Sequence, residues 1–177
     1  MRQRKKRLTQ VQKITATAVL AALTLLFLYA AALLPTVRLS LYALSSFFMI
    51  GLILEKEISY GWMMYIAVSI LGLVLIQDKM KMLPYIFFFG SYGVIKYYIE
   101  KVENIVVEIL IKLVYFSTVM LLLYVFASQI LFSDVKIKLP IWLILLGAQF
   151  IFFIFDYIYS RVIIFYEIRI RKYVFGS

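Results

Sequence analysis

The sequence predicts an all-α polytopic membrane protein, a single bundle of six transmembrane helices. Apolar residues make up 65% of its 177 residues and charged residues only 16%. Soluble domains contain about 45–50% apolar and about 25% charged residues. The apolar residues form long runs almost without charges. These runs lack the alternation of apolar and polar residues that is typical of a membrane β-barrel, so helices are the predicted form of crossing.

Six segments approach the length that a membrane-crossing helix needs, which is about 20 mostly apolar residues. The predicted spans are residues 14–35, 39–54, 58–77, 83–100, 108–133 and 139–166. Pro35 ends the first span, because proline lacks a backbone donor and clashes with the preceding turn. Pro84 suits the first turn of the fourth span, and charged residues separate the others. With a basic N-terminal segment, residues 1–13, the spans form one membrane domain over residues 1–177.

Lysine and arginine near the span ends predict the orientation of the chain. With a cytoplasmic N-terminus, 14 of these residues lie on the cytoplasmic side and 5 on the outer side. Cytoplasmic loops carry such an excess, so we expect a multi-pass plasma-membrane protein with both termini in the cytoplasm. The basic residues 2–7 then anchor the topology and contact anionic lipids. A nucleic-acid-binding arm needs a soluble face that this chain lacks, and the following apolar run is longer than that of a signal peptide.

The composition also excludes several kinds of chemistry. The sequence contains neither cysteine nor histidine, which removes disulfides, thiol catalysis, imidazole acid–base chemistry and the usual zinc ligands. It has no glycine-rich phosphate loop, and Asp156 is the one acidic residue well inside a predicted span. Catalysis in a membrane usually requires clustered acids or a nucleophile beside a base. We therefore expect no enzyme activity, no metal site and no cofactor.

Lys96 and Asp156 are the candidate functional residues at membrane depth, where ionisable groups are costly. At a rise of about 1.5 Å per residue, they lie roughly 20 Å and 24 Å from the outer ends of their spans. They therefore have similar heights in the inner part of the bilayer, and we expect them to form an intramembrane ion pair. Two alternatives remain: Lys96 extends to the cytoplasmic interface, or Asp156 pairs with Arg161.

Three stretches of the sequence resemble a known family. The first span opens with KITATAVLAAL at residues 13–23, LLPTVR at residues 33–38 leads to the second span, and residues 83–100 read LPYIFFFGSYGVIKYYIE. Together with six short helices and two cytoplasmic ends, they resemble the substrate-binding S-components of energy-coupling factor (ECF) transporters. Residues 83–100 are also similar to small bacterial membrane proteins of this general type. The resemblance covers the whole chain as an architecture.

The resemblance implies a membrane subunit that binds a small solute, such as a vitamin, in the outer half of the bilayer. Uptake would be driven by a transmembrane coupling protein with ATPase subunits, and membrane lipids surround the chain. Ala18 and Ala22 match the alanine spacing with which the family docks on its coupling protein. The residues expected to contact the solute are Arg38, Tyr92, Gln129 and Gln149.

A structural or assembly protein of the cell envelope is the alternative function. Such a protein would be similar to the small multispanning partners of cell-shape machineries. It needs no cavity, and its charged cytoplasmic loops would bind partner proteins. An enclosed polar cavity reached by Arg38, Tyr92 and Gln149 favours solute binding, whereas a solid bundle favours the structural role.

Overall fold

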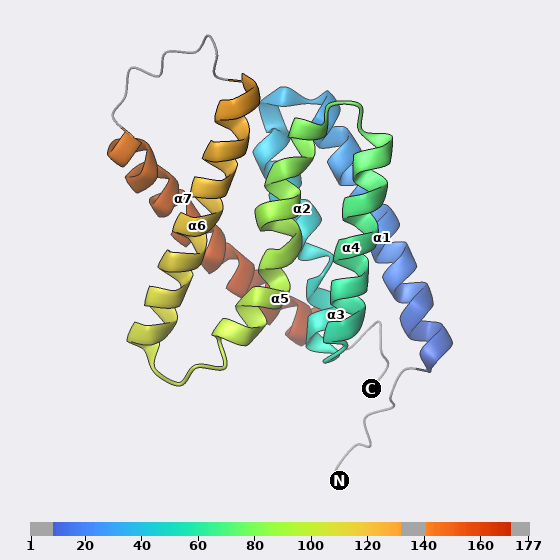
Figure 1. Ribbon diagram of the computed structural model, residues 1–177. Helices are drawn as coiled ribbons and strands as arrows, with labels where there is room; N and C mark the ends of the chain where they lie inside the picture. The colour runs from blue at the N-terminus through green and yellow to red at the C-terminus, as the bar shows by residue number, and fades with distance from the viewer. Residues whose placement is uncertain (1–8, 132–140, 171–177) are drawn as a thin grey trace.

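A computed structural model describes the backbone of residues 9–131 and 141–170 and the side chains of residues 9–123 and 146–168. All the secondary-structure elements in this part of the chain are helices, joined by short connections (Figure 1). Five segments are long and apolar enough to cross a membrane: Gln10–Leu33, Pro35–Leu54, Ile58–Leu75, Ile105–Leu123 and Leu146–Ile168. The predicted fold class, an all-α polytopic membrane bundle, is therefore confirmed.

Helix α1 (Gln10–Leu33) begins four residues before the predicted apolar span because polar residues cap it. The Thr9 hydroxyl accepts a hydrogen bond from the Gln12 backbone, and the Gln12 side chain accepts one from the Thr9 backbone. This reciprocal capping box satisfies donors that the first turn leaves free. The helix ends just before the short 3₁₀ turn η1 (Pro35–Val37), where the proline was expected to stop it.

The predicted second span forms two helices, α2 (Arg38–Phe47) and α3 (Ile50–Leu54). The hydroxyls of Ser45 and Ser46 each donate to the backbone carbonyl three residues before them. Such local hydrogen bonds compete with the regular helical ladder. They coincide with the break between α2 and α3, which an apolarity scan does not register.

The third predicted span corresponds to α4 (Ile58–Leu75), but the fourth has a more complex form. A 3₁₀ turn, η2 (Lys79–Met82), and a π-helical turn, η3 (Tyr85–Phe89), lead into the ten-residue helix α5 (Gly90–Ile99). This segment is not among the five long apolar spans. This segment therefore consists of three short helices of different kinds in place of one long α-helix.

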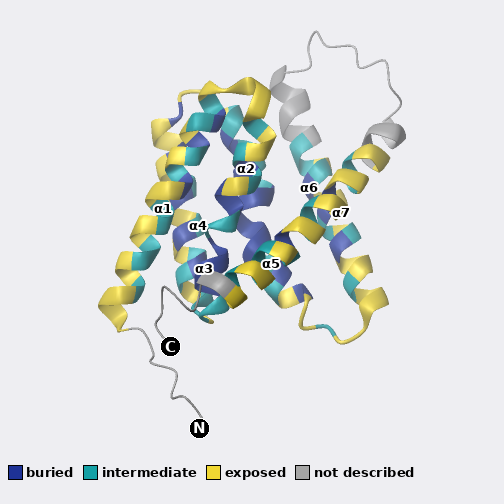
Figure 2. Cartoon of the chain, turned by 180° about the vertical axis from the view of Figure 1, so that it is seen from behind, coloured by how far each residue is buried: buried dark blue, intermediate teal, exposed yellow. Residues whose placement is uncertain are grey.

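Helix α5 lies in the middle of the bundle, and seven of its ten residues are buried (Figure 2). Its glycines allow neighbouring aromatic residues to approach closely. A Cβ atom at Gly90 would lie 2.8 Å from Cδ2 of Tyr65 and 2.8 Å from Cε1 of Tyr85. Because other helices surround α5, its polar side chains must find partners inside the protein.

Helices α6 (Ile105–Leu131) and α7 (Ile141–Phe165) complete the bundle, and the π-helical turn η4 (Tyr166–Ile170) follows α7. Helix α1 packs against α2 and α4, while α6 packs against α7. Helix α7 crosses behind α5 at a steep tilt (Figure 1). The start of α1 and the end of α7 lie at the same end of the bundle, as an even number of crossings requires.

Candidate functional site

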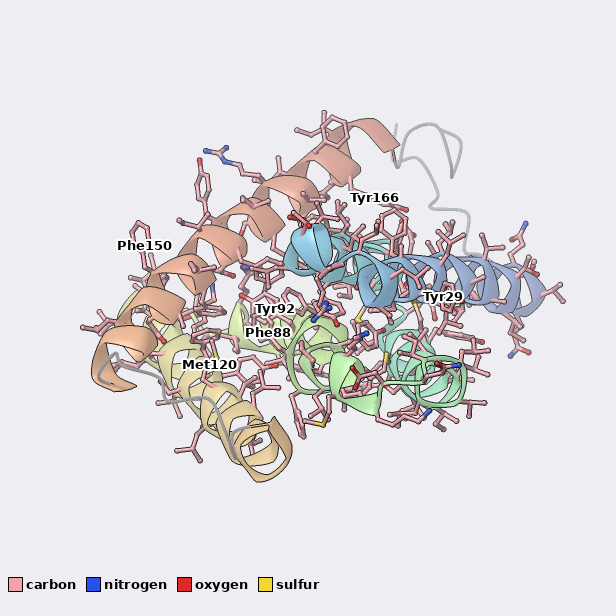
Figure 3. All side chains as sticks on the ribbon, turned by 90° about the horizontal axis from the view of Figure 1, so that it is seen from above. Tyr29, Phe88, Tyr92, Met120, Phe150 and Tyr166 are labelled. Carbon is pink, nitrogen blue, oxygen red and sulfur yellow. The ribbon has the colours of Figure 1, made fainter. Side chains whose placement is uncertain are left out.

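An apolar cavity of about 440 Å³ lies between α2, η3, α6 and α7 and is open on one side, where its lining residues Leu39, Ile151 and Ile154 are exposed. Its lining includes Ala43, Phe88, Met120 and Ala148, and of the described residues around it only Ser40 has a polar side chain. Viewed from above, Phe88 lies near the centre of the bundle and Met120 extends toward it from α6 (Figure 3). This volume falls within the range of small-molecule sites, about 300–1,000 Å³. The cavity therefore has the size of a ligand site and an apolar wall.

Tyr92 forms the next layer of the protein, one helical turn further along the chain from Phe88. Its side chain is fully buried. The centroid of its ring lies 5.1 Å from that of Phe88, 5.7 Å from that of Phe152 and 5.3 Å from that of Phe155. All three phenylalanines line the cavity. Tyr92 therefore packs directly behind the wall of the cavity.

The hydroxyl of Tyr92 donates a hydrogen bond to Oδ1 of Asp156. This carboxylate belongs to a group of five charged side chains from α5, α6, α7 and the connection after α5. We call this group the charge cluster; its members are Lys96, Glu100, Glu108, Lys112 and Asp156.

The two lysines of the charge cluster each contact more than one carboxylate. Nζ of Lys96 pairs with Oδ1 of Asp156 and lies 2.8 Å from Oε1 of Glu100. Nζ of Lys112 lies 2.9 Å from Oδ2 of Asp156 and 2.7 Å from Oε1 of Glu108. A longer contact of 3.9 Å joins Lys112 to Glu100. The charge cluster thus links three helices through alternating charges.

Burial makes these contacts necessary. The side chain of Lys96 is 1% exposed, that of Lys112 is 7% exposed and that of Asp156 is 14% exposed, whereas Glu100 is 39% exposed. An unpaired buried charge costs several kcal/mol, so buried charges are found paired and hydrogen-bonded. Two ammonium groups face three carboxylates, which gives a formal charge of −1. The exposed position of Glu100 places the surplus carboxylate where water can solvate it.

The structure brings Lys96 and Asp156 together, as the sequence predicted. Lys96 does not extend out to an interface, because Asp156 and Glu100 hold its ammonium group inside the bundle. Arg161 instead donates to the hydroxyl of Tyr157 at 2.8 and 2.9 Å. Both alternatives to the ion pair are therefore absent from the described part of the chain.

Lys112 is the functional candidate that the sequence reasoning missed. Sequence spacing shows only that it lies four residues after Glu108, which is typical of a solvent-exposed helical pair. In the structure Phe116 and Val119, which follow it at helical spacing, are buried, but the helix is apolar on nearly all sides, so residue spacing alone does not identify this face. A lysine on the buried face of a membrane helix needs an internal partner, and Asp156 supplies it.

The polar residues predicted to contact a solute do not share one site. Nε of Arg38 donates to the backbone carbonyl of Ala31 at 3.2 Å, which ties it to the end of α1. Tyr92 joins the charge cluster, and Gln149 lies in α7 beside the lining residue Ala148. Nε2 of Gln149 is buried without a hydrogen-bond partner. The side chain of Gln129, in α6, lies outside the described residues.

Ala18 and Ala22 lie on the exposed outer face of α1. They are four residues apart, so they form one small-residue surface on which another helix can approach closely. Their exposure means that packing within this chain does not use that surface. For metal binding, the described residues contain no group of three or more acidic, histidine or cysteine side chains in a suitable arrangement.

The structural features of the site are therefore an apolar cavity, an aromatic layer built around Tyr92, and a buried charge cluster. The chain matches no family model, no curated protein and no solved structure with which it was compared.

Proposed function

We propose that this protein is a membrane-embedded binding subunit for a small apolar molecule, similar in its role to an ECF S-component. The observation that carries the proposal is the cavity of about 440 Å³ between α2, η3, α6 and α7. A protein whose role is purely structural gains stability by filling such a space, since tight packing maximises dispersion contacts. Retaining an open apolar cavity of this size is consistent with ligand binding.

The wall of the cavity favours an apolar ligand over a polar vitamin. Phenylalanine, leucine, isoleucine, valine and methionine side chains supply most of its surface. A polar ligand would lose its hydrogen bonds to water there without replacement, which is unfavourable. The polar groups first expected to hold a solute, those of Arg38 and Tyr92, already have protein partners. Ligand selection would then depend on shape and apolar contact.

Energy for uptake would come from partner proteins, as the ECF resemblance implies. The exposed pair Ala18 and Ala22 supports this part of the proposal, because close helix–helix approach in membranes uses small residues. The coupling protein would pack a helix against α1 at this surface. Ligand binding and partner docking then occupy different faces of the molecule, so each can be perturbed separately.

The proposal is tested by purifying the protein from its native membrane under mild conditions and identifying bound small molecules and proteins by mass spectrometry. An apolar compound and an ATPase pair with a coupling protein are expected. Ala148→Phe fills the cavity and should remove the compound, whereas Ala67→Phe, on the exposed face of α4, should retain it. Ala18→Leu with Ala22→Leu should release the proteins and keep the compound.

Different results would contradict different parts of the proposal. If the purified chain carries no small molecule, or if Ala148→Phe leaves its amount unchanged, the cavity is not a ligand site. Recovery of cell-envelope assembly proteins in place of an ATPase pair would support the structural alternative. If the double alanine variant still retains an ATPase pair, α1 is not the docking surface.

A further inference from the structure

We infer that the charge cluster transmits the occupancy of the cavity to the connection between α5 and α6, residues 100–104. The inference rests on the proposed function for its trigger, a molecule in the cavity. It adds a conformational output at the opposite end of α5. A continuous set of contacts joins the cavity wall to Glu100 through Tyr92, Asp156 and Lys96.

Tyr92 is the junction between the apolar and the ionic parts of this path. Its ring packs against three residues of the cavity wall, and its hydroxyl donates to Asp156. The side chain is fully buried and its ring is surrounded by other aromatic rings, so its position depends on theirs. When a ligand displaces Phe88 or Phe155, the Tyr92 ring must move with them. The hydroxyl then leaves Oδ1 of Asp156.

Asp156 responds because it is held from two sides. Tyr92 and Lys96, both on α5, bind Oδ1, whereas Lys112 on α6 binds Oδ2. Loss of the Tyr92 hydrogen bond leaves Asp156 with one contact to α5, from Lys96, while its contact with Lys112 on α6 is unchanged. Asp156 therefore moves toward Lys112 when the cavity fills.

The lysines provide the second arrangement that a switch requires. Lys96 already lies 2.8 Å from Glu100, so it can transfer its main contact from Asp156 to Glu100 without becoming unpaired. Lys112 likewise keeps Glu108 at 2.7 Å in both arrangements. Each state satisfies every buried ammonium group, and the difference between them appears at Glu100. This residue is 39% exposed and directly follows α5, so partner proteins can sense its position.

The experiment measures the distance between spin labels at two exposed positions, Ile14 on α1 and Val106 on α6. The chain contains no cysteine, so Ile14→Cys and Val106→Cys give exclusive labelling. Ala148→Phe, and independently Ala43→Phe, imitate an occupied cavity without requiring a known ligand. We expect either filling variant to shift the main distance by roughly 1–2 Å, the usual scale of helix shifts.

Tyr92→Phe keeps the ring and removes the hydroxyl, so it should abolish the difference between the filled and unfilled forms. Tyr115→Phe is the matched control, because that hydroxyl contacts Ser91 and a backbone carbonyl instead of the charge cluster. It should leave the shift intact. Two filling variants are used because one of them can misfold, which is detected as loss of the helical circular dichroism signal. The other variant then still tests the inference.

The inference is overturned if folded Ala148→Phe and Ala43→Phe proteins give the unfilled distance, or if the shift persists in Tyr92→Phe. Failure of the proposed function looks different. In that case no small molecule is recovered from the purified protein, although the filling variants still shift the distance. A recovered ligand without a distance shift refutes the transmission alone.

Discussion

Replacing Lys96 with methionine should destabilise the protein measurably, because it removes one donor from a buried carboxylate. Asp156 then keeps Lys112 and Tyr92 but loses the ammonium group bound to Oδ1. A hydrogen bond to a charged group contributes about 1.5–3 kcal/mol. Complete isolation of a buried charge costs about 3–5 kcal/mol. Since two donors remain, we expect the lower range, a loss of about 1.5–3 kcal/mol.

Asp156→Leu should cost more, about 3–6 kcal/mol, because it removes two charge-assisted hydrogen bonds of about 1.5–3 kcal/mol each. Lys96 then keeps Glu100 and Lys112 keeps Glu108. The double variant with Lys96→Met should lose less than the sum of the single losses, since it removes both partners of one pair. The free energy of unfolding is measured by titrating a denaturing detergent into mixed micelles. Lys56→Met, at an exposed turn, is the matched control and should change the free energy by less than about 0.5 kcal/mol.

The loss of unfolding free energy in Lys96→Met distinguishes a buried charge pair from an ordinary interhelical hydrogen bond. Neutral hydrogen bonds between membrane helices contribute about 0.6 kcal/mol on average. A Lys96→Met loss of that size would show that the pair behaves as an ordinary interhelical contact. An effect no larger than that of Lys56→Met, or additive losses in the double variant, would refute the reasoning from a buried charge.

Two further predictions concern packing and topology. Gly90→Ala should destabilise the fold by about 1–3 kcal/mol, because the added methyl group overpacks against two tyrosines. Gly147→Ala, whose Cβ would meet nothing within 4 Å, should be neutral or slightly stabilising in the same unfolding assay. Equal effects of the two substitutions would contradict the central position of α5. Membrane-impermeant thiol reagents should label Asp78→Cys from outside intact cells and Glu103→Cys only after the membrane is opened. The reverse pattern would invert the predicted orientation.

The sequence was sufficient to predict the helices and their approximate limits, because apolar run length is a direct consequence of bilayer thickness. It also placed Lys96 and Asp156 at similar depth, since helical rise converts residue number into height. Their partner Lys112 was missed because the depth argument considers each residue along its own helix. Which faces meet depends on how helices tilt and pack, as the oblique course of α7 shows.

The internal breaks of the helices were also beyond a scan for apolar runs. The interruption after α2 coincides with two serine hydroxyls bonded to nearby carbonyls, and η3 adopts a π-helical form within an uninterrupted apolar run. The cavity depends on side chains from four separate elements. Its shape follows from their packing in three dimensions, which residue spacing along one helix does not encode.

The central position of α5 has a consequence for how the chain is made. This ten-residue helix carries a lysine that is 1% exposed, and a segment so short and charged partitions poorly into lipid by itself. Its interhelical partner Asp156, on α7, is synthesised after it. Stable insertion of α5 must therefore wait for α6 and α7 to leave the ribosome, so the middle of this protein is completed last.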